Sequence, residues 1–144
     1  MNCPYCDNQS IEPRIIFHND LIKVFPTNIP ITVGHVLICP ARHVSRIDQL
    51  SDAELKAIKQ GLILLQASII KSFGAEGFNI AWNEGAVAGQ SVNHLHIHLV
   101  PRKSGDSGVY GYDPRQFLYR PGARHESPDA ELGEVARLIR GNLE

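Results

Sequence analysis

The chain has 144 residues, a formal net charge of −1 and a calculated isoelectric point of 6.6. This length is enough for one domain with a substantial hydrophobic core. The near-neutral charge excludes the strongly basic surface of most nucleic-acid-binding proteins, so any phosphate recognition must come from local groups, and we expect no nucleic-acid partner.

Two observations argue against secretion and membrane insertion. The first residues lack the charged-then-apolar pattern of a secretory signal. The longest apolar stretch, around residues 61–70, carries Gln66 and Ser68 and is too short to span a bilayer. We expect a cytoplasmic protein with no membrane partner.

The three cysteines do not suggest a disulfide framework. Cys39 lies in an apolar run and is predicted to be a buried thiol. Cys3 and Cys6 form a Cys-x-x-Cys pair, which in a reducing compartment suggests metal or redox chemistry, although an unligated surface pair is the alternative. Two thiolates and two imidazoles make a closed structural zinc site, for which His43 and one later histidine are suitable partners.

The first third of the chain predicts three strands. Residues 14–18 and 21–25 are rich in branched and aromatic side chains, and Asn19 and Asp20 supply the turn of a hairpin between them. A proline-bearing loop over residues 26–30 then leads to a third strand, residues 35–39, which stops at Pro40.

A long amphipathic helix follows. Ser51 and Glu54 form a capping box, and Gly74 and Gly77 end the helix after about Phe73. Its apolar residues recur at spacings of three and four, which predicts a stripe facing the core without a catalytic role. The stripe consists of Leu55, Ile58, Leu62, Leu65 and Ile69.

The remaining sequence predicts two more strands, residues 78–83 and 94–101, joined by a turn rich in small residues. Residues 103–124 are expected to form a loop, and a short helix after Ser127 as N-cap and Pro128 as first helical residue would close the chain. Five strands joined by turns, with one long helix crossing between the third and fourth, predict an α+β fold on a mostly antiparallel sheet.

The segment from His94 to Val100 is the strongest functional signal. His94, His96 and His98 alternate with apolar residues, so on a strand they would form one row while Leu95, Ile97 and Leu99 face the core. A row of imidazoles facing solvent adds little stability, yet imidazole can bind a metal, attack an electrophile or transfer a proton. The row therefore indicates a reaction centre rather than a polar strand face.

The residues before this row could bind phosphate. Gly85 and Gly89 allow close approach of the backbone, and Gln90 and Ser91 bring side-chain donors. By itself this stretch would be an ordinary tight hairpin. Beside three histidines, a concave anion site is the better interpretation.

These motifs together resemble the histidine triad (HIT) superfamily of nucleotide hydrolases and transferases. The resemblance covers about residues 3–102, including the His94–Val100 segment, Asn83–Gly85, Gly89–Val92 and Gly34–Leu37. It implies a single HIT domain over residues 1–144, with residues 103–144 as a C-terminal extension. Some of these pieces are similar to the Hint branch and others to the Fhit branch, so both remain open.

The resemblance implies a role for each matching residue. His96 corresponds to the nucleophile that attacks the α-phosphorus and forms a nucleotidyl-histidine intermediate. His98 corresponds to the residue that contacts the phosphate and helps to protonate the leaving group. The positions implied for substrate binding are Thr27, Asn28, His35, Asn83, Gly89, Gln90, Ser91 and His98.

One of these positions departs from the family pattern. The ribose hydroxyls are usually held by an acidic residue or Asn, where this chain has Thr27 followed by Asn28. Either the side chain of Thr27 accepts a hydrogen bond from one ribose hydroxyl, or Asn28 takes its place. In the C-terminal segment, Tyr110, Tyr112, Arg115 and Arg120 would fold over the leaving group or pack at a dimer interface, and packing is favoured.

Zinc-containing bacterial members of the superfamily resemble this chain in having Cys3, Cys6, His43 and His94 at their ligand positions. The implied cofactor is one structural Zn²⁺ per chain, which would hold one end of the histidine segment.

The predicted function is hydrolysis of nucleoside monophosphate P–N or P–O linkages, with purine nucleotides favoured, by a homodimer. The alternatives are a nucleotidyltransferase or phosphorylase that uses phosphate as acceptor, and a nucleotide-binding module without turnover.

Overall fold

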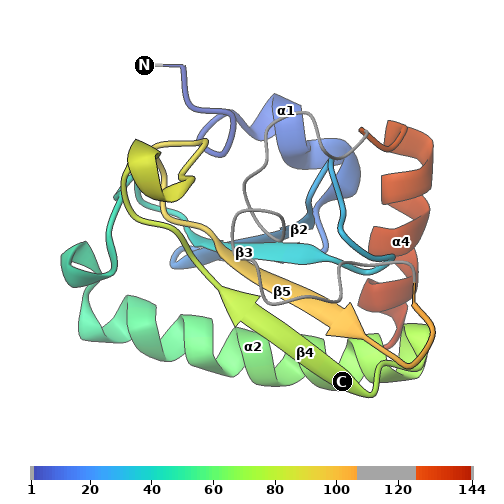
Figure 1. Ribbon diagram of the computed structural model, residues 1–144. Coiled ribbons are helices and arrows are strands. Elements are labelled where there is room, and N and C mark those ends of the chain that lie inside the picture. The colour runs from blue at the N-terminus through green and yellow to red at the C-terminus, as the bar shows by residue number, and fades with distance from the viewer. Residues whose placement is uncertain (1, 107–125, 144) are drawn as a thin grey trace.

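The computed structural model describes residues 2–106 and 126–143. Its elements in chain order are α1 (Asn8–Ile11), the 3-10 helix η1 (Glu12–Arg14), β1 (Phe17–His18), β2 (Ile22–Pro26), β3 (Val36–Pro40), η2 (Ile47–Gln49), α2 (Asp52–Phe73), β4 (Gly77–Ala81), η3 (Ala86–Ala88), β5 (Ile97–Arg102) and α4 (Asp129–Gly141). The strands form one antiparallel sheet in the order β1-β2-β3-β5-β4 (Figure 1). The predicted α+β class with a five-stranded antiparallel sheet is confirmed.

The long helix α2 begins and ends where the sequence predicts. Ser51 and Glu54 form the capping box, and Gly74 adopts a left-handed conformation just beyond the last turn. Within α2, a Cβ atom at Gly61 would lie 2.7 Å from Cδ1 of Ile38. Glycine therefore lets the helix approach β3 more closely than any other residue would.

The predicted apolar stripe of α2 is wrong at its first member. Ile58, Leu65 and Ile69 are buried, but Leu55 is 49% exposed. In the first turn it is Glu54 that is buried, and its carboxylate is paired with Arg42 at 2.8 Å.

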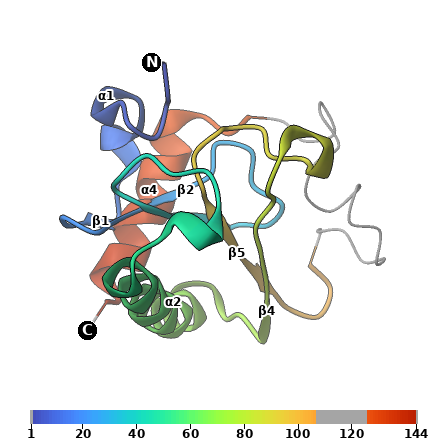
Figure 2. The ribbon, with the colours of Figure 1, turned by 90° about the vertical axis from the view of Figure 1, so that its left-hand side faces the viewer.

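Two apolar layers cover the two faces of the sheet. Helices α2 and α4 pack on one face, in a core whose buried residues are Ile16, Ile22, Val24, Val36, Ile38, Ile58, Leu65, Ile69, Ile97, Leu99, Ala136 and Ile139. On the other face, Phe25, Leu37 and Cys39 pack with Ile11 of the N-terminal segment. Figure 2 shows α1 and α2 on opposite sides of β1. The predicted burial of Cys39 is confirmed, and burial raises the pKa of its thiol to about 12.

Several predicted boundaries are wrong. The strand predicted to start at Arg14 starts at Phe17, because residues 8–14 form α1 and η1. The strand predicted over residues 78–83 covers 77–81, so Gly77 opens β4 instead of ending the helix. The last strand begins at Ile97 rather than His94, because the backbone before it bonds to a loop: Leu95 donates to the carbonyl of Val44 at 2.7 Å.

The C-terminal helix α4 packs against α2 and η1, but its predicted cap is wrong. Pro128 occupies the N-cap position, and the N–H of Ser127 donates to the carbonyl of Asn28 instead. Most of the loop predicted over residues 103–124 lies outside the described residues, as do Tyr110, Tyr112, Arg115 and Arg120. Within the described part of the chain, no helix is both long and apolar enough to cross a membrane.

Candidate functional site

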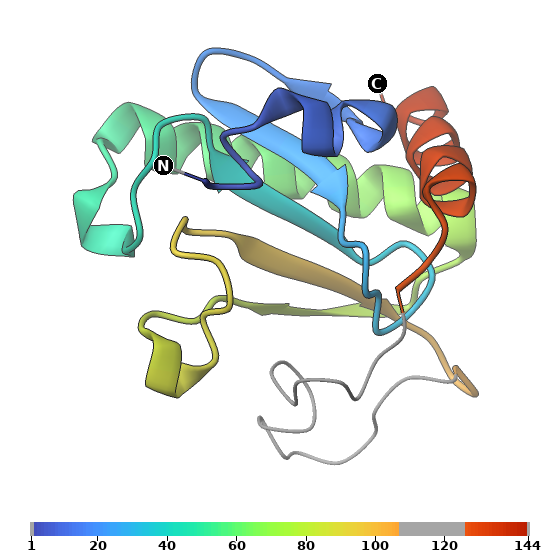
Figure 3. The ribbon, with the colours of Figure 1, turned by 90° about the horizontal axis from the view of Figure 1, so that it is seen from above.

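The three histidines lie at one end of the sheet, with His94 and His96 in the segment before β5 and His98 at the start of β5. The loops after β3 and β4 and the segment before β5 lie at the end opposite α4 (Figure 3). Leu95, Ile97 and Leu99 are buried, as expected for their side of the segment. The expectation that the histidines face solvent is wrong, because His94, His96 and His98 are 0%, 5% and 6% exposed.

Tyr5 of the N-terminal segment is part of the reason for this burial. Its ring meets the rings of His94 and His96 edge-on, with centroids 5.9 and 5.2 Å apart. It also packs against Phe25 at 5.2 Å. The N-terminal segment thus forms one wall of the histidine site.

His96 has a hydrogen bond that fixes its tautomer. Its Nδ1 lies 2.8 Å from the backbone oxygen of His94. A carbonyl can only accept, so Nδ1 carries the proton and Nε2 keeps its lone pair. Burial lowers the pKa of His96, opposed by this hydrogen bond, and so favours the neutral ring. The ring therefore has the form that a nitrogen nucleophile requires.

His35 and His98 form a second oriented pair. The backbone N–H of Ile31 donates to Nδ1 of His35 at 3.0 Å, which leaves the proton of a neutral ring on Nε2. That Nε2 lies 2.9 Å from Nδ1 of His98 and donates to it. In the neutral His98 ring, the proton is consequently on Nε2. The ring centroids of His96 and His98 are 5.1 Å apart. The Nε2 lone pair of His96 and the Nε2 proton of His98 therefore belong to adjacent rings.

The structure brings together all four residues predicted to bind zinc. The ligand atoms of Cys3, Cys6, His43 and His94 lie within 4.8 Å of one another. Nδ1 of His94 is 3.5 Å from both sulfurs, and Nδ1 of His43 is 3.4 Å from Sγ of Cys6.

The orientation of His94 also fits a metal site. Its Nε2 donates to the carbonyl of Pro40 at 2.8 Å, which leaves the Nδ1 lone pair directed at the sulfurs. Burial lowers the pKa of His94 and so favours the neutral ring that binds metals. A set of two thiols and two imidazoles, one of them oriented by a backbone carbonyl, is typical of a closed tetrahedral zinc site.

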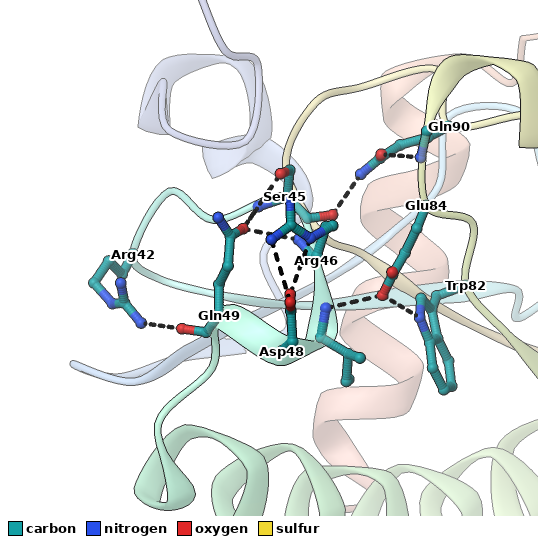
Figure 4. Close-up of polar contacts among 10 residues, drawn as sticks. Arg42, Ser45, Arg46, Asp48, Gln49, Trp82, Glu84 and Gln90 are labelled. Carbon is teal, nitrogen blue, oxygen red and sulfur yellow. Dashed lines mark hydrogen bonds and ion pairs between the residues drawn. The ribbon is translucent and has the colours of Figure 1, made fainter.

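The glycine-rich segment forms a loop around η3. Gly85 and Gly89 flank η3 with φ angles of 91° and 96°, which side chains with a Cβ rarely adopt. The side chain of Gln90 spans the loop: Oε1 accepts from the N–H of Gly85 at 2.8 Å, and Nε2 donates to the carbonyl of Ser45 at 2.9 Å (Figure 4). Asn83 donates to the carbonyl of Gly89 at 3.4 Å, and Ser91 is exposed.

The two candidate ribose ligands differ in their surroundings. Thr27 is buried, and its Oγ1 accepts from the N–H of Ile29 at 3.3 Å. Asn28 is exposed at the adjacent position. The hydroxyl of Thr27 is thus engaged with the backbone, whereas the side chain of Asn28 is accessible.

Sequence reasoning missed three residues at or beside this site. Tyr5 could have been noticed because it lies between the two cysteines, and Glu84 because it precedes the glycine-rich loop. Arg14 gave no signal. It is 9% exposed, its guanidinium lies 5.4 Å above the ring of Phe25, and its Nε has no partner among the described residues.

Comparisons with known proteins agree with this geometry. The sequence model of the HIT domain matches residues 8–105. An uncharacterized HIT-like protein of Methanocaldococcus jannaschii is 31% identical over 96% of this chain and 99% of its own length. The asymmetrical bis(5'-nucleosyl)-tetraphosphatase of Schizosaccharomyces pombe is 34% identical over 71% of this chain, which spans only 56% of that relative. A zinc-bound histidine triad family protein from Mycobacterium smegmatis superposes with a TM-score of 0.74 at 25% identity, covering 99% of this chain and 93% of the other.

The hydrogen bonds predict the protonated nitrogen in each ring. Long-range ¹H–¹⁵N NMR at neutral pH should detect the proton of His96 on Nδ1, and those of His35 and His98 on Nε2. The first two follow from backbone partners, and the third follows from the side chain of His35. The exposed His18 provides the reference for a ring without such constraints. A His96 ring protonated on Nε2 would contradict the orientation described.

Proposed function

Since this chain belongs to the HIT family, we propose that it is a nucleotide hydrolase that releases nucleoside monophosphates through a nucleotidyl-histidine intermediate. The observation that carries the proposal is the pairing of His96, whose Nε2 has a lone pair, with His98, whose Nε2 carries a proton. Relatives named as hydrolases of bis(5'-nucleosyl) polyphosphates support the substrate class. Purine nucleotides are the favoured substrates.

In the first step, Nε2 of His96 attacks the α-phosphorus, and the bond from phosphorus to the leaving group breaks with its electron pair on the leaving group. The substituted ring is then a cation, which the carbonyl of His94 stabilises through the Nδ1 hydrogen bond. His98 donates a hydrogen bond from Nε2 to the departing atom. In the second step, water attacks the phosphorus, the bond to His96 breaks, and the proton leaves with the nucleotide and passes to solvent.

The same tautomers favour a P–O over a P–N linkage. His98 already accepts a hydrogen bond at Nδ1 from His35, so the pair favours a neutral His98. A neutral imidazole stabilises an anionic phosphate leaving group, whereas an amine leaving group needs a full proton. We therefore propose phosphoanhydrides such as dinucleoside polyphosphates as preferred substrates.

The roles proposed for the surrounding residues follow from their positions. Gly89, Gln90 and Ser91 would bind phosphate, and Asn83 would contribute to the nucleotide pocket. Asn28, which is exposed, is the better candidate for the ribose than Thr27.

We further propose one domain over residues 1–144 with a core of about 3–102, supported by the packing of α4 on α2 and η1.

Replacing His96 with Asn tests the mechanism. The amide can still donate to the carbonyl of His94 but lacks a nucleophilic ring nitrogen, so turnover of diadenosine triphosphate should fall by at least about 10³-fold while AMP binding remains measurable. The exposed His18→Asn variant should keep wild-type activity. Full activity of His96→Asn would contradict the proposed nucleophile. Faster cleavage of an AMP phosphoramidate than of the anhydride by the wild type would contradict the proposed linkage. Formation of a nucleoside diphosphate from added phosphate would contradict water as the acceptor.

We also propose that Cys3, Cys6, His43 and His94 hold one structural Zn²⁺, which would lock the N-terminal segment against the histidine site. Reduced protein purified without chelator should contain about one zinc per chain by mass spectrometry of the metal. Cys3→Ser should lose the metal and lower the melting temperature, since a thiolate ligand is removed. Cys39→Ala, which removes a buried thiol outside the cluster, should keep it. Absence of zinc from the wild type would overturn this assignment.

A homodimer across the edge of the sheet is the proposed assembly. Strand β4 lies at one edge and exposes Ile80, and α2 exposes Ile63 and Ile70. Ile80→Glu should therefore convert a dimer to a monomer in sedimentation equilibrium. The matched change at another exposed apolar residue, Val33→Glu, should leave the dimer intact. A wild-type protein that sediments as a monomer at micromolar concentration would contradict the proposal.

A further inference from the structure

Three consecutive residues of the loop after β3 each contact a different part of the site. Nδ1 of His43 lies 3.4 Å from Sγ of Cys6. The carbonyl of Val44 accepts from the N–H of Leu95 at 2.7 Å, between His94 and His96 in sequence. The carbonyl of Ser45 accepts from Nε2 of Gln90 at 2.9 Å. One short length of backbone thus connects the cysteine cluster, the histidine segment and the glycine-rich loop.

Glu84 makes a second connection between the same two loops. Its Oε2 accepts from the backbone N–H of Ile47 at 2.9 Å and from Nε1 of Trp82 at 3.0 Å (Figure 4). Glu84 is half-buried and forms no ion pair with a described residue. The bond from Ile47 ties the two loops together, and the bond from Trp82 orients the carboxylate from its own segment.

The glycine-rich loop depends on these connections because it lies beyond the sheet. The pairing of β4 with β5 ends at Ala81 opposite His98. Between Gly85 and Gln90, the backbone hydrogen bonds stay within the loop itself. Two of its residues, Gly85 and Gly89, are glycines with positive φ angles. Because glycine can adopt many backbone conformations, the loop sequence alone restricts its conformation little. The side chains of Glu84 and Gln90 connect it to the His43–Ile47 loop.

We propose that Glu84 is a positioning residue, which holds the Asn83–Ser91 loop against the His43–Ile47 loop, and that the metal cluster acts on the glycine-rich loop through this contact. His43 ties its loop to the cluster, and Glu84 and Gln90 tie the glycine-rich loop to His43–Ile47. Only the expected effect on catalysis rests on the proposed hydrolase function; the coupling of the loops is a property of the fold.

Hydrogen–deuterium exchange tests the contact without an activity assay. In zinc-loaded protein, Glu84→Ala should raise exchange about tenfold in residues 83–91 and 43–47, the factor that corresponds to one charge-assisted hydrogen bond. Glu84→Gln keeps an acceptor oxygen and should stay near wild type. The matched control is Glu76→Ala, which removes a carboxylate bonded to the N–H of Ser104 at 2.7 Å, outside both loops. Unchanged exchange in Glu84→Ala, or an equal rise in Glu76→Ala, would overturn the proposal.

Removing zinc tests the coupling to the metal. Chelation of the wild type should raise exchange in residues 83–91, and chelation of the double variant Glu84→Ala/Gln90→Ala should add little, because both connections between the loops are then removed. Additive effects of chelation and substitution would contradict a shared route.

Kinetics with diadenosine triphosphate then separate positioning from general damage. Glu84→Ala should raise KM about tenfold with a smaller effect on kcat, and Glu84→Gln should restore KM. An unchanged KM in Glu84→Ala with altered exchange would contradict the catalytic part of the proposal. If the wild type cleaves no nucleotide, the hydrolase function fails, while the exchange result still decides the coupling of the loops.

Discussion

The backbone carbonyl of His94, which accepts from Nδ1 of His96, is the constraint on which the site depends. It decides which nitrogen of the neighbouring imidazole has a lone pair. The position of that carbonyl is in turn set by the His94 side chain, because Nε2 is bonded to Pro40 at the end of β3 and Nδ1 faces the thiols. One residue thus connects the sheet, the cysteine cluster and the ring of His96.

The four buried histidines illustrate how backbone hydrogen bonds differentiate identical side chains. His96 and His94 each donate to a carbonyl through a different ring nitrogen. His35 accepts from a backbone N–H and passes the orientation to His98. Because a neutral imidazole has only one proton, each such bond decides whether the opposite nitrogen carries a lone pair or a proton, which is the basis of the roles proposed for these rings.

Much of the fold follows from local sequence, and the predictions that were wrong depend on contacts with segments distant in the sequence. The α2 helix could be predicted because its capping box and its terminal glycine act locally. The start of β5 at Ile97 could not, since the preceding residues alternate as a strand does but bond to Val44 in a distant loop. The burial of the histidines depends on the N-terminal segment folding over them, which alternation along one strand does not encode.

The candidate site also contains residues that the sequence predicts and contacts that it does not predict. Cys3, Cys6, His43 and His94 were predicted from residue type and family resemblance, and the fold brings them together. The bracing contacts of Glu84 and Gln90 could not be predicted, because their partners are backbone groups of a separate loop. Polar residues in a glycine-rich loop suggest ligand binding equally well. Only the placement of Ser45 and Ile47 reveals the bracing contacts.

The sequence His43-Val44-Ser45 has a consequence for how this chain tolerates insertions and deletions. Surface loops usually vary in length without harm, because few contacts depend on their register. Here three adjacent residues face three different partners, so one inserted or deleted residue would displace all of the contacts that follow it. At the turn of Asn19 and Asp20, which joins β1 and β2 at the far edge of the sheet, the side chain of Asn19 accepts from the N–H groups of Leu21 and Ile22 within the hairpin itself. Length variation should therefore be accepted at the hairpin and rejected between Pro40 and Ile47.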